Sequence, residues 1–186
     1  PVAWQDIGSN RVHVPVQYQI DQSGAIGFAV GAYNQRYPLI VDPILQYSSY
    51  LGGSIDDNGY DIALDADGYI YIAGLTNSAN FPGVSGLPGA SAEAVVTKLS
   101  PDGSTILYTT ILGGNGHDSA RGIAVDTTGN VLITGWTASS DFPLVNAIQP
   151  TFWGSPYDMF IAKLSPDGQQ VIYSTYLGGD NLDLGN

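Results

Sequence analysis

The sequence predicts an all-β protein, and three observations point to it: recurring strand-like blocks, abundant turn formers, and acidic residues that favour turns over helices. The 186 residues include 24 glycines and 11 prolines. All 17 acidic residues except Glu93 are aspartates. Aspartate favours turns because its short carboxylate hydrogen-bonds to nearby backbone, whereas glutamate favours helices. We therefore expect short strands joined by charged turns, with little helix.

The strand-like blocks recur in the same order along the chain. YSSYLGG at 47–53 returns as YTTILGG at 108–114 and as YSTYLGG at 173–179. The other recurring pairs are DIALDADGYIYIAGLT (61–76) with GIAVDTTGNVLITGWT (122–137), SANFP (78–82) with SSDFP (139–143), and AVVTKLSPDG (94–103) with MFIAKLSPDG (159–168). Repeats start near residues 47, 108 and 173, so the chain holds about two full repeats and part of a third.

Each repeat contains four predicted strands. In the second repeat, ILYTTIL at 106–112 is followed by strands at 122–126, 130–136 and 158–164. Asp67-Gly68 suits a tight hairpin turn, because glycine readily adopts a positive φ. Four short antiparallel strands per repeat, stacked by repetition, are typical of β-propeller blades.

The first 44 residues lack the repeat and form a separate predicted region. RVHVPVQYQI (11–20) alternates in polarity and, with IGFAVGAY (26–33), predicts a hairpin, and 37–43 adds a short strand. These strands fit two arrangements: the end of a separate β-domain, or an irregular sheet that joins 44–51 into a first blade. We accordingly divide the chain into a β-strand region, 1–44, and propeller-type repeats, 45–186.

The quoted blocks resemble the SBBP repeat, a β-propeller repeat of bacterial secreted and cell-surface proteins. The resemblance rests on YSTYLGG, on GIAVD followed by the TGN turn, on DFP and on AKLSPDG, and it covers 45–186. Residues 1–44 resemble the end of the β-domain that often precedes these repeats. The resemblance implies an extracellular or surface-exposed propeller, and it brings no established catalytic residues. A closed propeller has about four to eight blades, more than this chain holds.

Composition excludes several classes of function. The net charge of −12, with only five Lys and Arg, argues against nucleic acid and anionic membranes as partners. The absence of cysteine excludes disulfides and thiolate zinc sites, and no apolar run is long enough to insert across a membrane. His117, Asp118 and Ser119 are adjacent, whereas a catalytic triad is assembled from distant positions, so we predict no enzyme activity.

Calcium is the one cofactor that the sequence suggests. Asp65-x-Asp67-Gly68 is similar to the start of a calcium-binding loop, although the later ligands and terminal glutamate of an EF-hand are missing. Asp56, Asp57 and Asp61 form a second candidate set. The alternative interpretation is that all five are ordinary turn aspartates.

The second of two insertions holds the best ligand candidates. The insertions, 77–92 and 138–157, separate the second and third strands of each repeat and should project as loops from one face. Phe152, Trp153 and Tyr157 lie in the second, where they could stack on sugar rings or fill a partner's pocket. The alternative is local packing of the loop.

We therefore predict a non-catalytic extracellular or cell-surface scaffold that binds a second copy of itself, another protein or a glycan. One alternative is a self-assembling subunit of an oligomer or surface filament, since open blade stacks expose apolar faces. A third is a hydrolase or lyase at the mouth of the propeller. The terminal Pro1 and the loop-like end of the sequence lead us to expect a piece of a longer protein.

Overall fold

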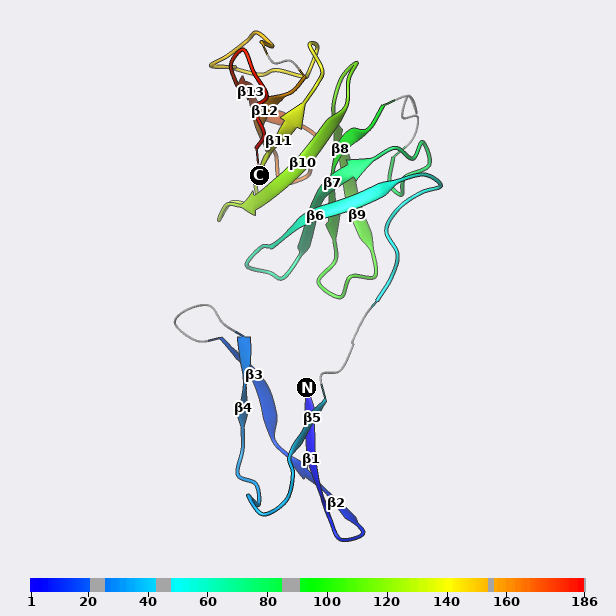
Figure 1. Ribbon diagram of the computed structural model, residues 1–186, viewed down its shortest axis with the longest axis vertical. Helices are drawn as coiled ribbons and strands as arrows, with labels where there is room; N and C mark the ends of the chain where they lie inside the picture. Colours follow the sequence, from blue (N-terminus) through cyan, green and yellow to red (C-terminus); the bar gives the residue numbers. More distant parts are fainter. Residues whose placement is uncertain (21–25, 43–47, 85–90, 154–155, 186) are drawn as a thin grey trace. The chain divides into compact units, whose positions relative to one another are not determined.

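The computed structural model describes residues 1–20, 26–42, 48–84, 91–153 and 156–185, and in them thirteen strands and no helix (Figure 1). The predicted all-β class with four-stranded antiparallel sheets is confirmed. No helix of the length and hydrophobicity that a membrane crossing requires occurs in these ranges. The chain forms two compact units, 1–48 and 49–186.

The first unit contains five short strands: β1 (Val2–Ile7), β2 (Asn10–Val14), β3 (Val16–Ile20), β4 (Ile26–Val30) and β5 (Ile40–Asp42). They form a three-stranded sheet in the order β2-β1-β5 and a separate β3-β4 hairpin. The stretch 11–20, predicted as one strand, is split at Pro15, which has no N–H to donate to a ladder. Gln5 is buried and donates to the carbonyl oxygens of Asn34 and Tyr37 at 2.7 and 2.9 Å.

The second unit contains two four-stranded antiparallel sheets, which we call blade 1 and blade 2. Blade 1 consists of β6 (Asp57–Leu64), β7 (Ile70–Thr76), β8 (Glu93–Leu99) and β9 (Ile106–Leu112). Blade 2 consists of β10 (Asp118–Val125), β11 (Val131–Thr137), β12 (Asp158–Leu164) and β13 (Val171–Leu177). In each blade the strands pair in sequence order (Figure 1).

The sequence repeat and the blade are offset by one strand. ILYTTIL at 106–112, which opens the second sequence repeat, is β9, the last strand of blade 1. In the same way, 171–177 is β13, the last strand of blade 2. The described part of the first such block, 48–53, has no strand and lies in neither blade.

The core of the second unit lies between the blades. We call the side of blade 1 that faces blade 2 its trailing face, and the side of blade 2 that faces blade 1 its leading face. The trailing face contributes Tyr71, Ala73, Ala94 and Val96 to one buried cluster, and the leading face contributes Val131, Ile133, Phe160, Ala162 and Leu164. Strand β10 packs against β6, β7 and β8, so the first strand of blade 2 crosses blade 1.

The segment after β13 repeats the path that leads from blade 1 into blade 2. The backbone N–H of Asp118 donates to Ala92 O at 2.7 Å, and that of Asp183 donates to Tyr157 O, the equivalent carbonyl, at 3.1 Å. Gly185 is buried beside the side chains of Thr134 and Met159. Residues 178–185 therefore lie on blade 2 as the start of β10 lies on blade 1.

Candidate functional site

One end of each blade carries the insertions, and we call it the insertion end. The strand register places Asp57 opposite Thr76 in blade 1. In blade 2 it places Asp118 opposite Thr137, and Thr137 in turn opposite Asp158. The two insertions leave from Thr76 and Thr137. Chain segments from both blades therefore meet at this end.

A repeated aspartate organises the insertion end. Asp57 accepts hydrogen bonds from the backbone of Gly53 at 2.7 Å and from the hydroxyls of Thr76 and Ser78 at 2.5 and 2.9 Å. In blade 2, Asp118 accepts from Gly114 N at 3.0 Å and from Ser139 Oγ at 2.7 Å. Asp183 is the third copy of this aspartate, and it likewise accepts from the backbone of a Gly-Gly loop, from Gly179 N at 2.7 Å. These bonds join the Gly-Gly loop to the first strand and the insertion.

The five aspartates predicted as calcium ligands lie in different local networks. Asp57 is the carboxylate just described, and Asp61 accepts from Ile62 N at 2.8 Å and, across the blades, from Ile123 N at 2.9 Å. Asp65 accepts from Tyr69 N and Tyr71 OH, both at 3.0 Å. Asp56 and Asp67 are exposed. Within the described ranges no three Asp, Glu or His side chains are arranged to hold a metal. Calcium binding stays a prediction.

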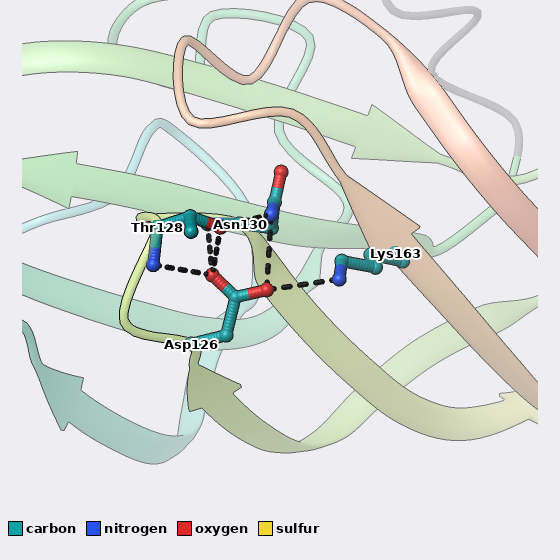
Figure 2. A network of polar contacts seen from close by, with 4 residues as sticks. All are labelled: Asp126, Thr128, Asn130 and Lys163. Atoms are coloured by element: carbon teal, nitrogen blue, oxygen red, sulfur yellow. Dashed lines mark hydrogen bonds and ion pairs between the residues drawn. The ribbon is translucent and has the colours of Figure 1, made fainter.

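A second network closes the turn between the first two strands of each blade, and Figure 2 shows it in blade 2. Asp126 accepts from Lys163 Nζ at 2.8 Å, from Asn130 Nδ2 at 2.9 Å and from Thr128 Oγ1 at 2.7 Å. The Lys163 ammonium and these donors hold the pKa of Asp126 well below its ordinary range. In blade 1 the equivalent ion pair joins Lys98 and Asp65 at 3.7 Å. Both networks stabilise turns.

A pair of buried carboxylates lies where the blades meet at the insertion end. Glu93 of β8 is 4% exposed and Asp118 of β10 is fully buried. Both carboxylates flank Gly113, where a Cβ would contact each of them. Burial raises the pKa of Glu93, and the nearby charge of Asp118 raises it further. Burial likewise raises the pKa of Asp118.

The bulges of the first strands aim two further side chains. The ladder shifts between Gly59 and Asp61 in β6 and between Ala120 and Gly122 in β10, leaving Tyr60 and Arg121 unpaired. Bulges re-aim a side chain and are frequent beside binding sites. The Arg121 guanidinium lies 3.7 Å from the centre of the Tyr60 ring and 5.7 Å from that of Trp136.

The strand opposite each bulge must carry glycine. A Cβ at Gly135 would clash with the carbonyl oxygen of Ser119, and one at Gly74 would clash with that of Asn58. The same residue type therefore permits the same bulge in both blades.

The three predicted ligand aromatics do not form one exposed patch. Phe152 packs edge-on against Tyr176, with ring centres 5.7 Å apart, and Tyr157 lies 4.5 Å from Trp136. Trp153 is 58% exposed, and its backbone N–H donates to Asp158 at 3.0 Å. Local packing accounts for Phe152 and Tyr157, and only Trp153 presents a large free surface.

Sequence reasoning did not identify Tyr60, Arg121 and Trp136 as a group. Tyr60 and Arg121 hold the same repeat position but differ in chemistry, within a run of four positions, 58–61 and 119–122, at which the two blades differ throughout. That difference was the available signal, and its meaning depends on a bulge that the sequence pattern does not reveal.

The adjacent His117, Asp118 and Ser119 belong to the structure of the blade junction. His117 Nδ1 accepts from the backbone N–H of Ala92 at 3.1 Å, and both Asp118 and Ser119 are fully buried. This arrangement gives the trio a structural part at the blade junction.

Comparison with known families agrees with the architecture. A family model described as a beta-propeller repeat, SBBP, matches residues 46–82 and 107–143. A second, described as a domain of unknown function (DUF7948), matches residues 1–44. A search of curated proteins finds no match.

The buried carboxylate pair makes stability depend on pH. The native pKa of Glu93 lies above that of the unfolded chain, so its protonated form is favoured in the fold. Relative to a neutral side chain, the wild type should lose stability as the pH rises above the ordinary glutamate value of 4.5. We expect E93Q to melt at a higher temperature than the wild type at pH 7, and at the same temperature once the pH is below 4.5.

Asp102, an exposed aspartate in a turn, gives a control in which the pKa is shifted downward instead of upward. Hydrogen bonds from Ser100 and Ser104 lower its pKa to about 2, so D102N should melt below the wild type at pH 7. A melting difference for E93Q that does not change with pH would contradict the assignment of a raised pKa to Glu93.

Proposed function

Since the chain carries two SBBP β-propeller repeats, we propose that it is a non-catalytic, extracellular or cell-surface binding scaffold whose binding surface is the insertion end. The observation that carries this proposal is a contrast between the hydrogen-bond networks that both blades repeat, which we call the frame, and the side chains at the surface that differ between the blades. Both blades repeat the aspartate network of Asp57 and Asp118 and the turn ion pair, whereas the bulge residues and the insertions differ. A constant frame that presents variable side chains suits recognition.

The extracellular part of the proposal is supported by the repeat family and by composition. The resemblance implies secreted or surface-exposed proteins. A net charge of −12 favours solubility and disfavours non-specific attachment to anionic surfaces.

The exposed Trp153 makes the binding proposal testable with glycans. In affinity gels that contain a panel of plant and bacterial polysaccharides, the chain should be retarded by at least one, without releasing new reducing ends. W153A should weaken the retardation, because it removes the 58% exposed ring, while Y18A, which removes a 53% exposed ring of the first unit, should not. Release of reducing ends, or free migration in every gel, would contradict the proposal.

Self-assembly is a second candidate function, favoured by the faces that the two blades leave open. Ile62 and Leu64 on the leading face of blade 1 are each 63% exposed, whereas their equivalents Ile123 and Val125 are partly buried in the blade junction. Leu132 on the trailing face of blade 2 is 39% exposed. The trailing face of one copy could therefore dock on the leading face of the next, in the manner of the internal junction.

Light scattering over a range of concentrations tests self-assembly. We expect the mass to rise above the 19.5 kDa of one chain, and I62D to prevent this by placing a charge on the open leading face. An incoming β6 would take the place of Asp183–Gly185, so removal of residues 180–186 should strengthen association. A mass of 19.5 kDa at every concentration, for both the wild type and the shortened chain, would contradict it.

A further inference from the structure

We propose that Arg121 is the anchor of a carboxylate-binding site at the insertion end, and that the ligand is a uronic acid residue of an acidic polysaccharide. The inference rests on the proposed binding function and specifies its ligand. The residues that carry it come from three strands: Tyr60 on β6, Arg121 on β10 and Trp136 on β11.

Arg121 differs from the other partly buried cations in having no acidic partner in the part of the chain that the structure describes. Lys98 and Lys163 are each paired with an aspartate, and the exposed Arg11 is paired with Asp6 at 3.0 Å. The Arg121 Nε is buried and has no hydrogen-bond partner among the described residues. Neither terminal nitrogen of Arg121 has a hydrogen-bond partner in the described ranges or is fully buried, so in a chain with 17 acidic residues these two nitrogens are the donors that can receive a carboxylate from outside.

The aromatic neighbours orient the guanidinium. The Tyr60 ring lies 3.7 Å from it and the Trp136 ring 5.7 Å from it, and Tyr157 supports Trp136 at 4.5 Å. Contact with these rings limits the positions that the guanidinium can take, and because Nε is buried, its two terminal nitrogens are the donors left for a ligand. A planar fork held in this way matches a carboxylate through two parallel hydrogen bonds.

Aromatic surface beside the guanidinium favours a sugar as the carrier of the carboxylate. Tyr60 is 38% exposed, and Trp153, in the insertion that leaves from the same end of blade 2, is 58% exposed. Flat, rigid rings with an apolar face suit the C–H face of a pyranose, and they lose little side-chain entropy on binding. A uronic acid presents both such a face and a carboxylate.

The charge of the chain makes this recognition selective. A net charge of −12 repels polyanions in general, so an acidic glycan binds only where a specific cation overcomes that repulsion. Arg121 is the cation of the insertion end that has no acidic partner among the described residues.

The test is a titration with a galacturonic acid trisaccharide, followed by tryptophan fluorescence, since Trp136 adjoins the guanidinium. The wild type should bind saturably. R121K, which keeps the charge but loses the planar fork, should bind about tenfold more weakly, and R121A should not saturate. R36A is the control, because Arg36 is exposed and belongs to the first unit, and its affinity should equal that of the wild type.

The neutral galactose trisaccharide and a glutamate-rich peptide complete the experiment. The neutral sugar should bind at least about tenfold more weakly than the acidic one. Equal binding of the two sugars, or unchanged affinity in R121A with an unchanged circular dichroism spectrum, would overturn the role of Arg121 and leave the binding scaffold standing. Tighter binding of the peptide would overturn the assignment to a sugar. Failure of the acidic trisaccharide to bind, in a chain that a neutral polysaccharide retards, would overturn the uronic acid alone.

Discussion

The packing of the trailing face of blade 1 on the leading face of blade 2 is the interaction on which the second unit depends. A four-stranded sheet has two faces, and a single sheet standing alone cannot bury both of them. The junction buries Tyr71 and Val96 against Ile133 and Phe160 in one cluster. Asp61 joins the first strands of the two blades through the backbone of Ile123. Because this packing fixes β10 on blade 1, it also fixes the insertion end.

Much of this fold follows from the sequence, because repetition at matched spacing marks strands, turns and insertions together. The tight turn at Asp67-Gly68, for example, follows from a glycine at the position that needs a positive φ, and Gly68 has a φ of 82°. The blade boundary did not follow, because β9 opens the sequence repeat but completes the preceding sheet. A sequence period fixes the length of a repeating unit and leaves its starting point undetermined.

The candidate site was harder to predict than the fold. Phe152 and Tyr157 looked available because they lie in a loop, yet both pack against aromatic rings of blade 2. Arg121 precedes the predicted strand at 122–126 and was assigned no role from the sequence, and the bulge places it against Tyr60, which lies on the other blade. Local composition thus drew attention to the second insertion, while the residues of the proposed site depend on contacts between distant segments.

Native-state hydrogen exchange tests most directly whether the blade junction holds the second unit together. If it does, the two blades unfold as one, so the core amides of Ala73 in blade 1 and Ile133 in blade 2 should exchange with the same free energy of opening. D61A removes the acceptor for the Ile123 amide and should lower both values equally. Different opening free energies for the two blades, or a loss confined to one blade in D61A, would contradict the dependence of both blades on their junction.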